Sequence, residues 1–373
     1  MSDKNPRILL EEIICNFMIY GSLLEILPLG KGHINDTFIS SWDQGGTTVR
    51  YTHQKINHNV FVHPDEVMEN ISRVTSHINM KLAGARDRGR RVLAVIPARD
   101  GKPWTRDTDG GWWRTYSYIE GTHTGDTASS PAEAELLGRC AGEFQKQLAD
   151  LGGPRLHETI VDFHNMETRY IRFHSALEKD ELNRAKDAKS EIGLLLDNEE
   201  RGGILIRSLR SKTIPERICH NDTKLNNILL DDSNGSALCV IDLDTVMPGT
   251  SLFDLGDLVR TVAITAAEDE RDLSKVAFDP VFHRALLKGY LSQALDFLVP
   301  SEYGLLCESG RNLTQIMCLR FCTDFLEGDH YYHTSRPGHN LDRCRTQIAL
   351  INSMDAQWDK AERTAGELVS RRI

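Results

Sequence analysis

The sequence contains no long hydrophobic run, no internal repeat and no low-complexity tract. A membrane-spanning helix needs about 20 consecutive apolar residues, and no stretch of the 373 residues approaches that length. A secretory signal needs an unbroken apolar stretch near the N-terminus, but Glu11 and Glu12 interrupt the first apolar segment. We therefore expect a cytoplasmic protein that has no membrane partner.

The sequence also lacks an excess of basic residues and an arrangement of cysteines typical of disulfides. Lys and Arg number 44 against 54 Asp and Glu, a net charge of -10, whereas nonspecific nucleic-acid binding needs clustered basic residues. We expect no nucleic-acid partner. The eight cysteines are scattered, which favours reduced thiols. Cys318, Cys322 and Cys344 are spaced like metal ligands, but an apolar helical context favours small buried side chains.

The order of predicted elements indicates an α+β protein with two lobes. Strand-like runs with turn residues between them dominate the first part, at 24–29, 36–42, 48–56, 92–97 and 112–119. Helical patterns occur at 7–20, from Pro64 to about 82, at 130–149, 165–196, 279–297, 301–327 and 340–369. We therefore predict a small sheet-rich lobe over residues 1–120, ending in a connector, and a large mainly helical lobe over residues 121–373.

Polar side chains with a characteristic spacing lie around two short apolar runs, 228–230 and 238–241. His220, Asp222 and Asn227 form the pattern H-x-D-x-x-x-x-N, and Asp242 follows twenty residues after Asp222. Oxygen-bearing side chains at the ends of adjacent strands suit Mg²⁺, held together with substrate phosphates. A carboxylate beside them is able to take a proton from a hydroxyl nucleophile. This layout is typical of phosphoryl transfer.

The spacing resembles the kinase-like phosphotransferases of the aminoglycoside phosphotransferase and choline kinase group. A third motif of that group, G-x-x-x-x-D-L, is present from Gly249 to Leu255. The resemblance implies a bilobal protein-kinase-like fold, with a small antiparallel sheet in the N-lobe. It implies that Asp222 is the catalytic base or orients the hydroxyl, and that Asn227 and Asp242 bind Mg²⁺. By the same resemblance His220 and Asp254 are structural, and Asp244 is either a ligand of a second metal ion or a solvated turn residue.

The N-terminal lobe should then bind ATP. Gly30 and Gly32 lie between two strand-like runs, where glycines let the backbone approach phosphates, although an ordinary hairpin turn looks the same. Lys55 ends the next strand and would pair with the phosphates, the alternative being an exposed lysine. Its partner should be a glutamate of the following helix, Glu69 or Glu66, of which we favour Glu69. The connector at 116–121 would contact adenine, through Tyr118 and Glu120.

The residues that flank these motifs resemble one subgroup, the N-acetylhexosamine 1-kinases. The resemblance lies in segments 32–37, 57–61, 68–71, 220–227, 240–249 and 325–329. It implies that ATP phosphorylates the anomeric C1 hydroxyl of GlcNAc or GalNAc. Candidate sugar-binding residues are Arg320 and Asp324, which are four residues apart on one helix face, together with Asp329, Asn35 and Asp36. An ion pair and simple turn chemistry are the structural alternatives.

Two other functions remain open from the sequence. In the first, the protein is a kinase for a different small alcohol: an aminoglycoside, choline or another amino alcohol, or homoserine. Aromatic residues are only 7% and none cluster at the H-x-D motif, so an aromatic cage for choline is not evident. In the second function, the chain is a catalytically silent nucleotide-binding regulator. The presence of Asp222, Asn227 and Asp242 argues against it. No obligate protein partner is evident, and the sequence leaves the oligomeric state open.

Overall fold

The computed structural model describes residues 6–29 and 34–371, and it divides into two compact units. The N-terminal unit comprises residues 1–122, 151–160 and 241–247, and the C-terminal unit comprises 123–150, 161–240 and 248–373. The first unit thus includes two segments from later in the chain than the predicted connector. One of them, 241–247, contains Asp242 and Asp244.

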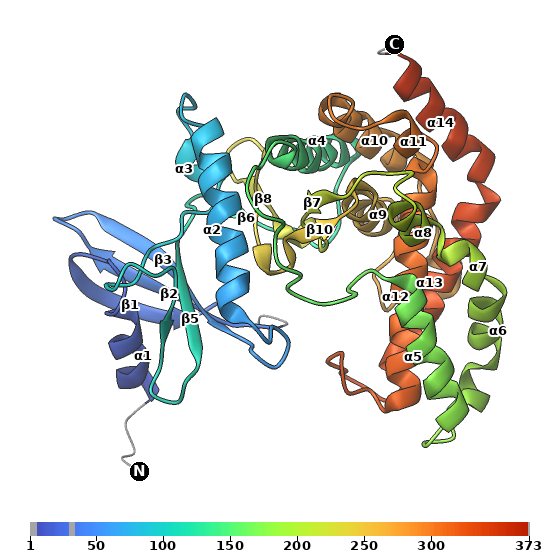
Figure 1. Cartoon of the computed structure of the whole chain (residues 1–373), viewed down its shortest axis with the longest axis horizontal. Coiled ribbons are helices and arrows are strands. Elements are labelled where there is room, and N and C mark those ends of the chain that lie inside the picture. The colour runs from blue at the N-terminus through green and yellow to red at the C-terminus, as the bar shows by residue number, and fades with distance from the viewer. Residues whose placement is uncertain (1–5, 30–33, 372–373) are drawn as a thin grey trace. The chain divides into compact units, whose positions relative to one another are not determined.

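The N-terminal unit is built on a five-stranded antiparallel sheet with the order β1-β2-β3-β5-β4 (Figure 1). The strands are β1 (Ser22–Pro28), β2 (Asp36–Asp43), β3 (Thr48–Ile56), β4 (Thr105–Arg106) and β5 (Trp112–Ser117). The helices are α1 (Pro6–Ile14), α2 (Pro64–Lys81) and α3 (Arg88–Arg91). Helix α2 begins at a proline, which suits a first helical position, and buries Val67, Ile71 and Val74 on one face.

The C-terminal unit is mainly helical (Figure 1). Its helices are α4 (Pro131–Leu148), α5 (Met166–Lys179), α6 (Lys189–Asp197), α7 (Glu199–Gly202), α8 (Ile204–Arg210), α9 (Ser251–Val262), α10 (Pro280–Ala294), α11 (Pro300–Tyr303), α12 (Leu306–Glu327), α13 (His339–Ala356) and α14 (Trp358–Ser370). Ser130 caps α4 by accepting a hydrogen bond from the backbone of Glu133, as the Ser-Pro-x-Glu pattern leads one to expect. Helices α4 and α10 pack closely because Gly138 and Gly289 lie at their contact.

Short strands carry the polar motifs into this helical framework. They are β6 (Thr122–His123), β7 (Arg217–Cys219), β8 (Ile228–Asp231), β9 (Ala237–Val240) and β10 (Met247–Gly249). Strands β8 and β9 form an antiparallel hairpin in which Ile228 is paired with Val240. The H-x-D-x-x-x-x-N motif therefore occupies the connection from β7 to β8.

The predicted fold class is confirmed, with an antiparallel sheet in the N-terminal part followed by a mainly helical part. Several predicted elements are wrong in detail. Residues 92–97 form no strand, since only an isolated bridge joins Val95 to Tyr116. The predicted helix at 165–196 is divided after α5, where Asp180 adopts a left-handed conformation that ends the helix. The predicted helix at 340–369 is divided into α13 and α14.

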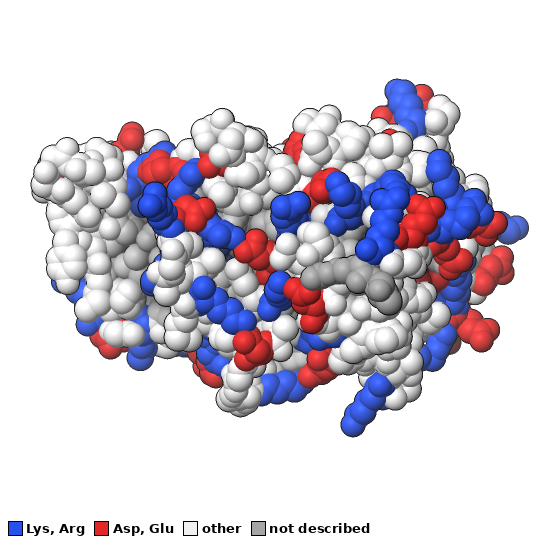
Figure 2. Space-filling model, turned by 90° about the horizontal axis from the view of Figure 1, so that it is seen from above, with Lys and Arg blue, Asp and Glu red and all other residues white. Residues whose placement is uncertain are grey.

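Surface charge and helix hydrophobicity agree with the composition. On the face shown in Figure 2, basic and acidic side chains are interspersed rather than gathered into one basic surface. Among the residues that the structure describes, no helix combines the length and the apolar character needed to cross a membrane.

Candidate active site

The loop from β7 to β8 is held by a buried carboxylate. Asp254, near the start of α9, accepts hydrogen bonds from the backbone amides of His220 and Asn221, at 3.0 and 2.7 Å. Gln145 of α4 donates to the same carboxylate at 2.8 Å. Asn221 adopts a positive φ of 64°, and its carbonyl oxygen lies 2.7 Å from Nε2 of the buried His164. The loop conformation is therefore fixed by contacts on both sides before any ligand binds.

Asp222 is placed by this loop and is surrounded by donors. Asn227 Nδ2 donates to the Asp222 backbone oxygen at 2.7 Å and to its Oδ2 at 3.0 Å. Lys224 Nζ lies 3.1 Å from the same Oδ2. Burial alone would raise the pKa of Asp222, but the charges of Lys224 and His220 outweigh it and lower that pKa. Asp222 is therefore ionised at neutral pH and able to accept a proton.

Asn227 has an oxygen suited to a hard cation. Its amide nitrogen is used within the loop, while its Oδ1 accepts no hydrogen bond from another described residue. The described part of the chain has no cluster of three or more His, Cys, Asp or Glu side chains arranged for a metal ion. A Mg²⁺ site that relies on one or two protein side chains and on substrate phosphates fits both observations.

In the N-terminal unit, Asp242 lies at the start of the short turn Leu243–Thr245 and has a left-handed φ of 60°. Asp244, on the same turn, is buried, and Arg114 of β5 forms a bidentate ion pair with its carboxylate. Asn35 Nδ2 also donates to Asp244, at 2.6 Å, and Asn35 Oδ1 accepts from the backbone amide of Asn57 at 2.9 Å. Both side chains thus make contacts inside the unit, while the metal role of Asp244 and the sugar role of Asn35 stay predictions.

Lys55 forms an ion pair that the sequence did not predict. Its Nζ lies 3.1 Å from Oδ2 of the buried Asp107 side chain, in the turn between β4 and β5. The register of β3 against β5 places Lys55 opposite Trp113, whose Nε1 donates to the same oxygen at 2.9 Å. Glu69 instead lies 3.1 Å from Nε2 of His157. The predicted Lys55–Glu69 pair is therefore wrong, while the nucleotide role of Lys55 stays a prediction.

The structure describes only some of the other residues that were predicted to contact ligands. Arg50 donates to the Glu120 carboxylate, and its guanidinium lies 4.1 Å from the centre of the Tyr118 ring. Both connector side chains are therefore braced by β3. Asp36 is an exposed residue at the start of β2. Gly30 and Gly32 lie outside the described residues.

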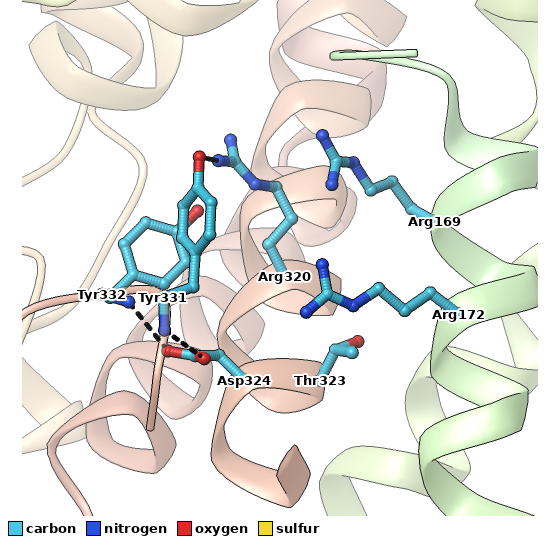
Figure 3. A pocket seen from close by; sticks show the side chains of 7 residues that line it. All are labelled: Arg169, Arg172, Arg320, Thr323, Asp324, Tyr331 and Tyr332. Atoms are coloured by element: carbon cyan, nitrogen blue, oxygen red, sulfur yellow. Dashed lines mark hydrogen bonds between the residues drawn. The ribbon is translucent and has the colours of Figure 1, made fainter. Parts of the chain in front are cut away.

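A pocket in the C-terminal unit lies between α5, α12 and the loop that follows α12 (Figure 3). It is lined by Arg169, Arg172, Arg320, Thr323, Asp324, Tyr331 and Tyr332. The Arg320 guanidinium lies over the ring of Phe163, and the next residue, His164, lies 2.7 Å from the carbonyl oxygen of Asn221, one residue before Asp222. The pocket is therefore close to the Asp222 loop within the same unit.

The two predicted sugar-binding acids, Asp324 and Asp329, form hydrogen bonds within the protein. Asp324 accepts hydrogen bonds from the backbone amides of Tyr331 and Tyr332, at 2.8 and 3.0 Å, and from Asn340 Nδ2 at 2.8 Å (Figure 3). Asp329 accepts from Arg184 at 2.6 Å and from Asn340 at 2.8 Å, and it does not line the pocket. Both carboxylates brace the loop that follows α12, and the sugar roles of Asp324 and Asp329 stay predictions.

Arg320 does line the pocket, and it is enclosed by aromatic rings. The centres of the Phe163, Tyr331 and Tyr332 rings lie 5.1, 5.5 and 5.3 Å from its guanidinium carbon. Arg169 and Arg172 also line the pocket and were not predicted. Their spacing of three residues on a helix places them on one face, which is a detectable signal, but charged residues at that spacing are common on helices.

Comparison with known proteins agrees with this architecture. Residues 25–296 match the model of the phosphotransferase enzyme family APH, and the chain belongs to that family. An aminoglycoside phosphotransferase from Alicyclobacillus acidocaldarius has a similar structure, with a TM-score of 0.60 and 11% identity over 98% of both chains.

Two ligand complexes are also similar in fold. The GDP complex of aminoglycoside 2'-phosphotransferase-IIIa has a TM-score of 0.58 at 13% identity, over 92% of this chain and 99% of that one. Spectinomycin phosphotransferase in complex with ADP and spectinomycin has a TM-score of 0.55 at 12% identity, over 95% and 98%. At these identities the likeness concerns the fold, and the family identifies the protein as a phosphotransferase.

Proposed function

We propose that this phosphotransferase is an ATP-dependent kinase that phosphorylates the anomeric C1 hydroxyl of an N-acetylhexosamine, GlcNAc or GalNAc. The observation that carries the proposal is the ionised Asp222, held in a preformed loop beside Lys224 and Asn227. Family membership supports the reaction class. The resemblance of the flanking motifs to the N-acetylhexosamine 1-kinases supports the acceptor.

The chemistry follows from the state of Asp222. Its carboxylate accepts the proton of the acceptor hydroxyl as the hydroxyl oxygen forms a bond to the γ-phosphorus of ATP. The bond from that phosphorus to the bridging oxygen breaks, and its electron pair leaves with ADP. Asn227 and Asp242 would hold Mg²⁺, which neutralises charge on the phosphates when bound. Most of the rate then comes from positioning and from charge neutralisation.

The N-terminal unit would bind ATP. In this proposal Lys55 contacts the phosphates, and its pairing with Asp107 holds the ammonium group at the end of β3 until the nucleotide arrives. The phosphate role of Gly30 and Gly32 stays a prediction from the sequence, and the connector with Tyr118 and Glu120 would contact adenine. Glu69 is not needed for this arrangement, because Asp107 takes the place of the expected glutamate.

The sugar would occupy the pocket around Arg320. The guanidinium of Arg320 and the hydroxyl of Tyr331, which are 3.3 Å apart, offer donors to hydroxyl and amide oxygens. Aromatic rings beside them suit the apolar faces of a sugar ring. The sugar role of Asp36, an exposed residue at the start of β2, stays a prediction.

The test is an ADP-release assay with ATP, Mg²⁺ and a panel of GlcNAc, GalNAc, glucose, choline, homoserine and kanamycin, followed by phosphorus NMR of any product. We expect turnover with GlcNAc or GalNAc and an anomeric phosphate. Asp222→Asn should lower kcat by about 10²- to 10⁴-fold and spare ATP affinity. Asp232→Asn is the control, since Asp232 is an exposed carboxylate in the β8–β9 turn.

Each outcome of this assay is informative. Turnover with choline, homoserine or kanamycin alone would keep the role of Asp222 and discard the sugar. Unchanged turnover in Asp222→Asn would remove that carboxylate from the reaction. ATP binding without turnover of any acceptor would favour the regulator over the enzyme.

A further inference from the structure

The pocket around Arg320 carries more positive charge than the protein neutralises. Arg172 is paired with Glu327, with Nε–Oε1 at 3.0 Å. Arg169 donates only to the backbone oxygen of Phe163, at 2.9 and 3.3 Å. Arg320 contacts the Tyr331 hydroxyl and a methionine sulfur. Within residues 6–29 and 34–371, neither Arg169 nor Arg320 forms an ion pair with a carboxylate.

Among the described residues, no carboxylate forms an ion pair with either arginine. The Asp324 carboxylate accepts hydrogen bonds from three backbone amides of the following loop and from Asn340, all of them uncharged, so it keeps its negative charge. Asp222 is paired with Lys224. Three arginines line the pocket against Asp324 and the Glu327 that pairs with Arg172, which leaves a local positive charge in a chain whose net charge is -10.

The two unpaired arginines face each other across the pocket. Figure 3 shows Arg169 reaching from α5 toward Arg320 on α12. Burial and the charge of Arg320 lower the pKa of Arg169 to about 10, so both groups are still charged at neutral pH. An arrangement that holds two like charges together in the free protein gains from an anion placed between them.

We propose that the acceptor carries an anionic group, a carboxylate, sulfate or phosphate, that binds between Arg169 and Arg320. This inference rests on the proposed function, since it assigns the pocket near Asp222 to the acceptor. The preferred acceptor is then an acidic N-acetylhexosamine rather than the neutral sugar. Guanidinium groups bind such oxyanions through paired hydrogen bonds, which gives geometric selection as well as charge.

The experiment compares kcat/KM for GlcNAc with that for three acidic forms, the 6-sulfate, the 6-phosphate and the C6 carboxylate. We expect at least one acid to exceed the neutral sugar by about 10-fold or more, and the three arms identify which anion is bound. Arg169→Met should reduce that preference by about 10- to 100-fold, and Arg169→Lys should reduce it less. Lys179→Met is the matched control, because Lys179 is an exposed cation at the end of the same helix.

Inorganic sulfate provides a probe that does not depend on the acceptor. It should inhibit competitively against the acceptor and noncompetitively against ATP. Competition against ATP would mean that the arginines serve the γ-phosphate, and would overturn the inference. A preference for the neutral sugar, or an acid preference that survives Arg169→Met, would also overturn it while leaving the sugar kinase intact.

The failure of the proposed function is distinguishable from the failure of this inference. If no sugar is turned over, sulfate binding is measured directly by calorimetry on the wild-type chain and on Arg169→Met. A binding constant that Arg169→Met weakens by 10-fold or more, with Lys179→Met unchanged, supports the anion site for another acidic acceptor. Absence of binding, or binding equal in all three proteins, refutes it.

Discussion

Replacing Arg114 by methionine tests the buried ion pair that holds the segment with Asp242. The Arg114 and Asp244 side chains are 1% and 4% exposed, and Arg114 Nη2 lies 2.9 Å from Asp244 Oδ2. Arg114 Nε also donates to Gln54 Oε1 at 2.9 Å. In Arg114→Met the Asp244 carboxylate stays buried and keeps one side-chain donor, Asn35. An uncompensated buried charge costs about 3–5 kcal/mol, so the free energy of unfolding should fall by that amount.

The assay is urea unfolding followed by tryptophan fluorescence, with Trp112 and Trp113 on the strand that carries Arg114. The double variant Arg114→Met/Asp244→Leu should recover most of the loss, because an apolar pair of similar size removes the buried charge altogether. Lys102→Met is the control. It breaks an exposed pair with Asp100 at 3.5 Å, which is worth about 0–1 kcal/mol. A loss below about 1 kcal/mol in Arg114→Met, or a double variant no more stable than the single one, would refute the reasoning.

Two further predictions concern stability. Burial lowers the pKa of His53 and His164 to about 3 and that of His283 to about 4, below the ordinary value of 6.5. The unfolded chain therefore binds more protons than the folded chain below pH 6.5. The free energy of unfolding should fall as pH decreases from 6.5 toward 4, by about 1.4 kcal/mol per pH unit for each histidine. A free energy of unfolding in urea that is the same at pH 7 and pH 5 would contradict this. Gly289→Ala should lower the free energy of unfolding by about 1–3 kcal/mol or more, since its Cβ would lie 1.9 Å from a backbone oxygen of α4. Gly193→Ala, in open space on α6, should raise the free energy of unfolding by about 0.5–1 kcal/mol. Equal urea midpoints for the two variants would contradict the packing argument.

Local signals in the sequence predicted the framework well. Short-range rules predicted three features that the structure has. They are the Ser130 cap, the proline at the start of α2 and the division into a sheet-rich and a helical part. The spacing of the H-x-D-x-x-x-x-N motif also predicted that Asp222 and Asn227 share one loop. These features depend on residues within a few positions of one another, where backbone preferences are strong.

The partners of polar side chains were predicted poorly, because they depend on contacts between distant segments. Asp244 is paired with Arg114, 130 positions earlier, and no pattern along the chain connects the two. Lys55 is paired with Asp107 because of the register of β3 against β5. The prediction of Glu69 considered only the helix that follows Lys55 in the sequence. An acidic residue that looks like a metal or sugar ligand in sequence is thus often the partner of a buried cation.

The same reasoning underlies our proposal that the acceptor carries a negative charge. A net charge of -10 does not discriminate between acceptors, because the charges that matter are those left without an ion-pair partner after folding. Asp324 was predicted to bind the sugar, but its carboxylate accepts hydrogen bonds from the loop that follows α12 and forms no ion pair with Arg320. Arg169 then adds a second cation from α5. In our proposal, the specificity of this pocket is set by the arginine charges that no carboxylate of the fold pairs with, and the acidic acceptors test that directly.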